Sequence, residues 1–595
     1  MSDQALYLKA AEDLRRNPGQ WAAYESWGHC VVLAGPGSGK TKTLTVKLAR
    51  LLAEDVQEPR GVACITYNNE CARELENRLE ALRVEPGRRV FIGTVHSFSL
   101  TQIVLPYAKS TRLGLPDEFS VATRAERARA LTRAFRRTIG GPDNPQSWDF
   151  RMGNYRRSIL NRNSKEWRTR DPELAQLVEA FEEELRAMRR IDFDDMPLLA
   201  VRALRENEWL QHALYAKYPV LVVDEYQDLG RALHRMVMGL CFSAGMRLFA
   251  VGDADQSIYG FTGAHPDLLQ QLSQRDDVET VHLRLNYRCG SRIVTASSYA
   301  LGEERDYEAA GGAEEGTIYF HPRTGQYPQQ ADYLFSTLLP NIQGRLSELR
   351  LGEIAVLYPA AWIGDAVAEV ARDKGFPTIR TDGNSIYSRA SRLMRWLEQC
   401  AQWCSGGWQR GSPRFTRLVN EGARLFAEAL LTEDELFAFR RKLMETLWNR
   451  RSGNLSLHQW LAELRDTLID DLIAACRTLQ DEEETLSAFI ERTVDGGDCA
   501  EMVLGQFAGQ GVGNDCINLS TLHSSKGREF SVVIMFGMDY GRIPRSNVGP
   551  REHMEARRSF YVGFTRAKTE LHIMYSNHRP SPFVIEVQER LNEES

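Results

Sequence analysis

The sequence has little that would attach it to a membrane or cross-link it covalently. It lacks an apolar run of the roughly 20 residues that a membrane-spanning helix needs, and its first residues, MSDQALYLKAAEDL, lack the apolar core of a signal peptide. Its ten cysteines show no paired metal-ligand spacing, and the closest two, Cys400 and Cys404, have no Cys or His cluster beside them. These absences argue against a membrane protein, a disulfide scaffold and a zinc site. They favour a cytoplasmic protein with reduced, buried thiols.

An overall excess of basic residues is also missing, since the formal net charge is −6. The charge is uneven, however, because residues 124–170 contain thirteen Lys or Arg and four Asp or Glu, a local charge of +9. The aromatic residues among those arginines are Phe135, Trp148, Phe150, Tyr155 and Trp167. This mixture suits a phosphate backbone with exposed bases. It is equally typical of a solvated, arginine-rich helical insertion, and the sequence leaves both interpretations open.

The length of 595 residues predicts several domains. Short β-rich runs fall into an early and a late group, and they alternate with helical stretches, which implies two parallel α/β sheets. We expect strands at Val62–Thr66, Val90–Gly93, Val220–Glu225 and Arg247–Asp253, and later at Thr317–Phe320, Glu353–Tyr358, Ile517–Thr521, Val532–Gly537 and Leu571–Tyr575. Two stretches without strand signal, 105–196 and 391–505, are predicted helical insertions. The Gly-, Pro- and charge-rich residues 311–328 are a predicted boundary region.

The stretch VVLAGPGSGKTKTL, residues 31–44, has the features of a phosphate-binding loop. Three apolar residues predict a buried strand, the glycines that follow permit a tight loop, and KTKTLTVKLARLL predicts an amphipathic helix. Backbone N–H groups and the helix dipole then favour an anion. Lys40 can reach the outer phosphates of a nucleotide and the Thr41 hydroxyl can ligate Mg²⁺. Ala34 stands at the first position, where the usual pattern has glycine.

A second motif is LVVDEYQDL, residues 221–229, in which an apolar run ends in two adjacent carboxylates. In open α/β sheets ligands bind at the carboxyl edge of the strands. Asp224 can hold Mg²⁺ there, and Glu225 can orient and deprotonate an attacking water. Together with the phosphate loop, this pair predicts nucleotide hydrolysis.

These motifs and others in the same order resemble the UvrD, Rep and PcrA helicases of superfamily 1. The further matches are NPGQ (17–20), ITYNNECARELENRL (65–79), GTVHSF (93–98), IDFDDM (191–196), VGDADQSIYGFTGA (251–264), LNYRC (285–289), TLHSSKGREF (521–530) and YVGFTRAK (561–568). The resemblance covers nearly the whole chain. It implies two RecA-like P-loop motor domains with parallel sheets, each carrying a mainly helical insertion.

The resemblance also implies roles around ATP. Gln20 would read the adenine edge, Tyr287 would stack on its face and Glu529 would accept a hydrogen bond from the ribose. Gln256 would sense the γ-phosphate. Arg288 and Arg566 would reach the same phosphate from the second motor domain, so hydrolysis would be coupled to closure of a cleft.

The implied ATP-binding set is Gln20, Ala34, Gly35, Pro36, Gly37, Ser38, Gly39, Lys40, Thr41, Tyr287 and Glu529. The implied catalytic set is Lys40, Asp224, Glu225, Gln256, Arg288 and Arg566. Thr41 and Asp224 would hold Mg²⁺. On pattern alone, Tyr287 could instead be a core aromatic.

On the DNA side, the resemblance implies contacts from Thr66, Tyr67, His96, Phe261 and His523. The sequence departs from the family pattern at three places: Thr262 and Pro359 stand where Arg is common, and Arg528 stands where Leu is usual. We therefore expect ATP hydrolysis to be intact and the contacts with DNA to differ from those of the family.

The domains implied by the resemblance are a first motor domain at 1–104 and 195–283, with its arginine-rich insertion at 105–194. A second motor domain would occupy 284–390 and 506–595, with a compact insertion at 391–505. The implied activity is ATP-dependent 3′→5′ translocation on single-stranded DNA and unwinding of partly duplex DNA, in repair or antiviral defence. The compact form also resembles the helicase subunit of the Gabija antiphage system. The alternative is a DNA- and nucleotide-sensing ATPase that regulates a partner nuclease and unwinds little.

Overall fold

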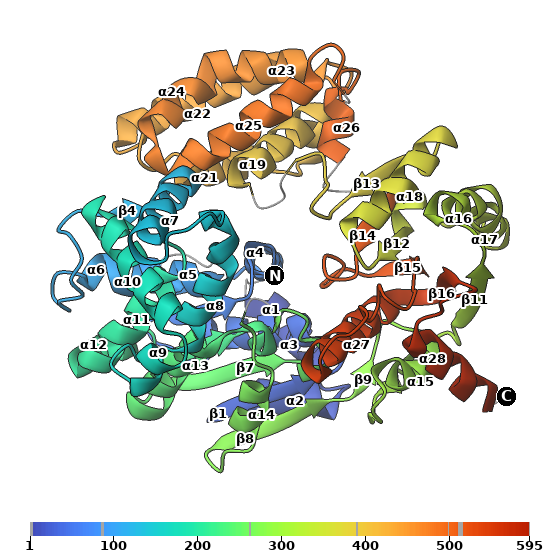
Figure 1. Cartoon of the computed structure of the whole chain (residues 1–595), viewed down its shortest axis with the longest axis horizontal. Coiled ribbons are helices and arrows are strands. Elements are labelled where there is room, and N and C mark those ends of the chain that lie inside the picture. Colours follow the sequence, from blue (N-terminus) through green and yellow to red (C-terminus); the bar gives the residue numbers. More distant parts are fainter. Residues whose placement is uncertain are drawn as a thin grey trace. The chain divides into compact units, whose positions relative to one another are not determined.

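The computed structural model describes residues 4–84, 89–260, 263–387, 391–497, 499–509 and 516–593. The chain forms two compact units. Figure 1 colours the chain along its sequence, from blue at the N-terminus to red at the C-terminus. The first comprises residues 1–317, 547–565 and 589–595, and the second comprises 318–546 and 566–588. The first unit thus ends at Thr317, inside the Gly-, Pro- and charge-rich stretch 311–328. Each unit is built on a six-stranded sheet.

The sheet of the first unit has the strand order β3-β2-β6-β7-β1-β8, and every neighbouring pair is parallel. Its strands are β1 (His29–Ala34), β2 (Val62–Thr66), β3 (Val90–Thr94), β6 (Val220–Val223), β7 (Arg247–Gly252) and β8 (Val278–Leu283). Residues of β2 and β6 are buried throughout, as the continuous apolar runs predict.

Alternate residues of each strand enter two different cores on the two faces of this sheet. In β6, Leu221 and Val223 belong to one core, while Val220 and Val222 belong to the other. The helices α11 (Asp195–Glu206), α12 (Glu208–Lys217) and α13 (Arg231–Val237) contribute to the first core, and α3 (Lys40–Arg50) and α4 (Asn69–Ala81) to the second. The predicted α/β class with parallel sheets is confirmed.

The predicted insertion at 105–196 is helical, with its own core. Its main helices are α7 (Arg124–Thr138), α8 (Asp149–Ser158), α9 (Lys165–Thr169) and α10 (Pro172–Ala187), preceded by the short α6 (Leu105–Tyr107). The expectation that this stretch contains no strand is wrong, because β4 (Ser120–Val121) and β5 (Arg190–Ile191) pair in parallel. Two residues are too few to show a strand period in a sequence.

The sheet of the second unit has the order β11-β16-β15-β12-β14-β13. Its strands are β11 (Thr317–Arg323), β12 (Ile354–Tyr358), β13 (Thr378–Arg380), β14 (Ile517–Thr521), β15 (Phe530–Met535) and β16 (Ala567–Ser576). The pairs β13–β14, β14–β12, β12–β15 and β15–β16 are parallel. Apolar residues of α16 (Tyr327–Tyr333), α17 (Leu339–Arg345) and α18 (Ala361–Asp373) share a core with the strands.

The second predicted insertion, 391–505, is helical in the part that the structure describes. It contains α19 (Arg392–Gln402), α20 (Trp408–Arg410), α21 (Phe415–Leu425), α22 (Glu433–Asn449), α23 (Leu457–Leu464), α24 (Asp470–Ala475) and α25 (Gln480–Thr493), and α26 (Leu504–Gly509) closes it. Trp396, Leu443 and Trp460 are among the buried residues of its separate core.

The remaining helices are α1 (Gln4–Leu14), α2 (Pro18–Glu25), α5 (Val95–Phe98), α14 (Asp267–Ser273), α15 (Ser291–Leu301), α27 (Pro550–Phe564) and α28 (Pro582–Glu593). The small strands β9 (Leu285–Asn286) and β10 (Glu308–Ala309) pair in parallel. Residues 284–317 and 547–565 pack with the first unit, whereas the sequence interpretation places them in the second motor domain; the division into motor domains stays a prediction. Across the described residues, no helix is long and apolar enough to cross a membrane.

Candidate nucleotide-binding site and nucleic-acid interface

The glycine-rich loop joins the end of β1 to the start of α3, as predicted. Gly37 and Gly39 have φ angles of +66° and +82°, a region that side chains disfavour. A β-carbon on Gly37 would lie 2.5 Å from Asn286 Oδ1, and one on Gly39 would lie 2.4 Å from Gln20 Nε2. The Ser38 hydroxyl donates a hydrogen bond of 2.7 Å to the carbonyl of Gly35. Both conformation and space therefore require glycine in this loop.

Lys40, the first residue of α3, places a buried ammonium group between two carboxylates. Its Nζ lies 3.8 Å from Glu225 Oε1 and 3.8 Å from Asp253 Oδ2. The same atom is buried and has no hydrogen-bond partner among the described residues. A buried ammonium has three donors to satisfy. Phosphate oxygens held by the loop would satisfy them, so the residues present fit a nucleotide.

Three carboxylates lie at the carboxyl ends of the neighbouring strands β6 and β7. Burial, followed by the charge of Glu225, raises the pKa of Asp224 to about 7. Burial raises the pKa of Asp253 to about 6, although the charge of Lys40 opposes this shift. Glu225 has a left-handed backbone, with φ of 51°. The carboxylates outnumber the single Lys40 cation, and a bound Mg²⁺ would relieve their repulsion.

Two glutamines hold these carboxylates in place. Gln256 Nε2 donates to Asp253 Oδ2 at 2.5 Å, and Gln227 Nε2 donates to Glu225 Oε2 at 2.5 Å. Gln227 Oε1 in turn accepts the N–H of Asp253 at 2.9 Å. Sequence reasoning selected Gln256 and Glu225 but missed Asp253 and Gln227. The signal for Asp253 was its place after an apolar run, as for Asp224.

The predicted base-binding residues gather beside the same loop. Gln20 Nε2 donates to the carbonyl of Ser38 at 2.9 Å, and the N–H of Tyr287 donates to the carbonyl of Gly37 at 2.9 Å. Asn17 connects them, since its side chain caps α2 and its Nδ2 donates to the Tyr287 hydroxyl at 2.9 Å. Tyr287 is 51% exposed, so the interpretation of it as a core aromatic is wrong. Its face is available to a base.

The predicted arginines occupy different units. A β-carbon on Gly37 would lie 2.7 Å from the β-carbon of Arg288, whose Nη1 donates to the carbonyl of Thr565. Arg566 belongs to the second unit, where it is buried and donates to the carbonyl of Arg528 at 3.1 Å. Glu529 of the same unit pairs with Lys568 at 2.8 Å. The structure thus brings Arg288 to the loop, and the roles of Arg566 and Glu529 stay predictions.

Most predicted DNA contacts are placed by the structure. Thr66 is buried at the end of β2, and the Tyr67 ring stacks on Tyr259 with a centroid distance of 4.6 Å. The His96 ring lies 5.6 Å from the ring of Phe193, which is 64% exposed. Sequence reasoning missed Tyr259 and Phe193, although both stand in motifs that it quoted.

Two histidines and residues 256–264, the part of the motif VGDADQSIYGFTGA that we call the coupling segment, complete this account. Burial lowers the pKa of both His96 and His523, so both rings are neutral near pH 7. His523 lies in the second unit. The predicted contact Phe261 and its neighbour Thr262 lie outside the described residues. Arg528, the unusual residue of its motif, donates to Thr381 Oγ1 at 3.0 Å and to the side chain of Asn518, and so links the residue that follows β13 to β14.

The site geometry agrees with comparison to known proteins. The UvrD/REP helicase N-terminal domain matches residues 16–277, and the UvrD-like helicase C-terminal domain matches residues 434–578. The chain belongs to the UvrD/Rep helicase family. It is 28% identical to the ATP-dependent DNA helicase Rep of Escherichia coli K12, over 96% of this chain and 94% of Rep. It is 25% identical to the helicase PcrA of Bacillus subtilis 168, over 95% and 83%. It is 24% identical to DNA helicase II of Escherichia coli K12, over 95% and 86%.

Within this UvrD/Rep-type chain, the arginine-rich stretch 124–170 differs from both sequence interpretations. Phe135, Tyr155 and Trp167 are buried in the core of the insertion, so the expectation that they face bases is wrong. Phe150 is exposed. The arginines are also only partly solvated, because many of them pair with carboxylates that lie farther along the chain.

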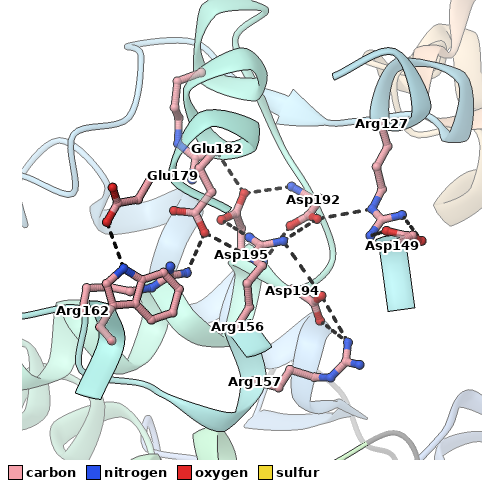
Figure 2. Close-up of polar contacts among 12 residues, drawn as sticks. Arg127, Asp149, Arg156, Arg157, Arg162, Glu179, Glu182, Asp192, Asp194 and Asp195 are labelled. Atoms are coloured by element: carbon pink, nitrogen blue, oxygen red, sulfur yellow. Dashed lines mark hydrogen bonds and ion pairs between the residues drawn. The ribbon is translucent and has the colours of Figure 1, made fainter. Parts of the chain in front are cut away.

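Arg156 is the centre of this pairing (Figure 2). Its guanidinium is fully buried and contacts Asp192 Oδ2 at 2.7 Å, Asp195 Oδ1 at 2.8 Å and Glu182 Oε1 at 3.0 Å. The backbone N–H of Asp192 donates to the side chain of Asp195 at 3.0 Å, and the backbone N–H of Asp195 donates to the side chain of Asp192 at 3.0 Å. Around this centre, Figure 2 shows Arg127 between Asp149 and Asp192, Arg157 on Asp194, and Arg162 on Glu182. The IDFDDM motif therefore ties the end of the insertion to its arginines.

Three of the exposed arginines form a stripe on α7. Arg129, Arg133 and Arg136 are spaced i, i+4 and i+7 and are exposed, while Leu131 and Phe135 of the same helix are buried. Arg133 lies 3.7 Å from Glu184, so its charge is partly balanced. The stripe is one part of the basic surface of the insertion, because Arg124, Arg137, Arg151, Lys165, Arg168 and Arg170 are also exposed.

Most of the cysteines are buried, as predicted. None of the ten forms a disulfide; eight of them, Cys400 and Cys404 included, are buried, and Cys71 and Cys516 are partly exposed. Among the described residues, no group of three or more Cys, His, Asp or Glu could hold a metal ion by itself.

Proposed function

We propose that this protein is an ATP-dependent DNA helicase that moves 3′→5′ on single-stranded DNA and unwinds partly duplex DNA. The observation that carries the proposal is the buried Lys40 ammonium between Glu225 and Asp253 beside the glycine loop, which has no hydrogen-bond partner in the described part of the chain. The relatives named above are ATP-dependent DNA helicases, which supports the same chemistry here.

The residues of the first unit divide the chemistry of hydrolysis. Backbone N–H groups at the start of α3 and the Lys40 ammonium bind the phosphates. Thr41 and Asp224 hold Mg²⁺, which neutralises charge on the phosphates. Glu225 orients the attacking water and accepts its proton, and Gln227 fixes the Glu225 carboxylate for this task. Gln256 responds to the γ-phosphate; in support of this role, Gln256 and Lys40 both contact Asp253 Oδ2.

DNA binding depends on stacking of bases on aromatic rings and on attraction between arginines and the DNA phosphates. Tyr67 with Tyr259, and Phe193 with His96, offer aromatic faces to bases. The exposed stripe on α7 offers guanidinium groups to phosphates. We place Phe261 and His523 on the same strand path by resemblance.

Steady-state ATP hydrolysis, measured with and without Mg²⁺ and single-stranded DNA, tests the proposal. We expect turnover to require Mg²⁺ and to rise with DNA, and Lys40→Ala to abolish it. Lys42→Ala is the matched control, because Lys42 lies two residues along the same helix, is half-exposed and is 3.9 Å from Asp13. Equal ATPase activity of the two variants would contradict the proposed nucleotide site. An ATPase rate that does not change when DNA is added would contradict the proposed DNA motor.

Strand displacement decides the direction and the alternative function. Unwinding of a duplex with a 3′ tail but not with a 5′ tail supports 3′→5′ movement. ATPase activity without displacement favours the sensor that regulates a partner nuclease, and co-purification with a nuclease would support this role. Placement in the cytoplasm, in DNA repair or in an antiviral system of the Gabija kind belongs to the proposal and needs tests in cells.

A further inference from the structure

The second unit contains a polar cavity that no motif of the sequence analysis uses. Its volume is about 580 Å³. Three segments line it, residues 325–330, 539–546 and 576–579, which follow the carboxyl ends of β11, β15 and β16. The N–H of Asn577 donates to the carbonyl of Arg323 at 2.8 Å and so holds two of these strand ends together. The carboxyl edge of such a sheet is where ligands bind in open α/β folds.

The floor of the cavity contains a buried polar atom without a partner. Gln330 is 2% exposed, and its Nε2 donates to the carbonyl of Gly325 at 3.0 Å. Its Oε1 is buried and accepts no hydrogen bond from any described residue. By contrast, Asp539 is satisfied, since its carboxylate accepts the N–H of Ser576 at 2.6 Å and the hydroxyl of Tyr327 at 3.1 Å. Among the described residues that line the cavity, Gln330 therefore supplies a buried acceptor without a hydrogen bond.

The walls are cationic and flanked by aromatic rings. Arg542, Arg579 and His578 line the cavity, against the single carboxylate of Asp539. The Arg542 guanidinium lies 4.8 Å from the centroid of the Trp362 ring, and Trp362 is 47% exposed. Guanidinium groups suit phosphate oxygens, and exposed aromatic faces suit bases.

We propose that this cavity binds a nucleotide, with its phosphate on Arg542 and Arg579 and with a base N–H group donating to Gln330 Oε1. The nucleotide is either one residue of a DNA strand or a free mononucleotide. In the first case the inference rests on the proposed function, and the loop at 539–546 supports it. Arg545 of that loop acts on His523, a predicted DNA contact, because its positive charge adds to burial in lowering the pKa of that histidine.

Binding of fluorescent oligothymidylate to the full chain, without ATP, tests the cavity. Arg579→Ala should raise the Kd at least fivefold and flatten the dependence of log Kd on log salt by about 0.7, the value for one phosphate of a single strand. Gln330→Leu should also raise the Kd but leave the salt slope unchanged, and its effect should vanish with an oligonucleotide that lacks bases. Arg372→Ala, an exposed arginine of the same unit, is the matched control. Melting temperatures of all variants show whether the fold is kept.

Cross-linking with iododeoxyuridine in the oligonucleotide identifies the occupant. A cross-link to Tyr540 or Tyr327 that persists in excess dTMP assigns the cavity to the strand. A cross-link abolished by dTMP while the oligonucleotide stays bound assigns it to a free nucleotide. The proposal is overturned if variants and control bind alike and no cross-link falls in the three lining segments. These binding measurements need no hydrolysis, so they remain decisive if ATPase or displacement fails.

Discussion

Replacement of Arg156 by methionine should destabilise the arginine-rich insertion far more than loss of any exposed arginine in the same segment. Methionine keeps most of the length of the side chain but removes the charge and all its donors. Arg156 is fully buried and bonds to Asp192 and Asp195, whose side chains are only 2–3% exposed. The substitution therefore leaves carboxylates facing one another in a site from which water is excluded.

The magnitude follows from this burial. Breaking a buried ion pair by removing one partner costs about 3–5 kcal/mol, and we expect the upper part of that range because three carboxylates lose the same cation. Arg168→Met is the matched control. Arg168 lies 3.7 Å from Glu179 with both side chains largely exposed, and such a pair contributes about 0–1 kcal/mol.

The pH dependence gives the prediction its sign. In the native protein burial tends to raise the pKa of Asp192, but the charge and hydrogen bond of Arg156, together with Arg127 and the N–H of Asp195, lower it. Burial, followed by the charge of Asp192, raises the pKa of Asp195 even with Arg156 present. Without Arg156 both folded-state pKa values rise above the unfolded values, and such groups stabilise the fold only while they are protonated. The deficit of Arg156→Met should therefore be smallest in acid and grow as the pH rises.

Hydrogen exchange of residues 149–196 measures this locally, so no two-state model of the whole chain is needed. At pH 8, amides of the insertion should lose protection in Arg156→Met and keep it in Arg168→Met. Melting temperatures at pH 5.5 and pH 8 should show the larger deficit at pH 8. Equal protection in the two variants, or a deficit that grows on acidification, would refute the reasoning.

Three further predictions address the motor itself. Glu225→Gln should keep nucleotide and Mg²⁺ affinity but reduce turnover at least a hundredfold, the usual weight of a positioned base; normal single-turnover hydrolysis would contradict the role. Arg129→Gln combined with Arg136→Gln should weaken binding of single-stranded DNA and lower the salt slope by about 1.4, and an unchanged slope would assign the α7 stripe to solvent. Phe261→Ala should largely keep ATPase activity at saturating DNA but lose strand displacement, since stacking of a base contributes about 1–3 kcal/mol. Parallel loss of melting temperature, ATPase and displacement would show that Phe261 only packs.

The fold was predictable because the relevant signals are local. The runs that became β2 and β6 are continuously apolar, and the glycines after β1 are required by positive φ angles and close approach. The two-residue strands β4 and β5 were not predictable, since their pairing depends on residues about 70 positions apart. The grouping of residues 284–317 and 547–565 with the first unit depends likewise on packing between distant segments.

The site was predictable residue by residue but not as a network. Asp253 follows an apolar run as Asp224 does, but its contact with Lys40 beside Glu225 depends on the adjacency of β6 and β7, which sequence order does not reveal. The +9 charge of residues 124–170 was misleading for the same reason. The carboxylates that pair with Arg156, namely Glu182, Asp192 and Asp195, lie outside the counted window. The net charge of a sequence window does not include carboxylates from outside the window that pair with its arginines in the fold.

The Arg156 network also bears on the coupling segment that starts at Gln256. A β-carbon on Gly263, the first described residue after Phe261 and Thr262, would lie 3.8 Å from Arg157 Nε. Arg157 also pairs with Asp194 at 2.9 Å, beside the exposed ring of Phe193. The segment that begins at Gln256, which we propose senses the γ-phosphate, therefore ends against an arginine whose neighbour in α8 is fixed by buried carboxylates. Because a rigid α8 holds Arg157 in place, loosening of α8 in Arg156→Met should lower the displacement obtained per ATP hydrolysed, while ATPase at saturating DNA persists.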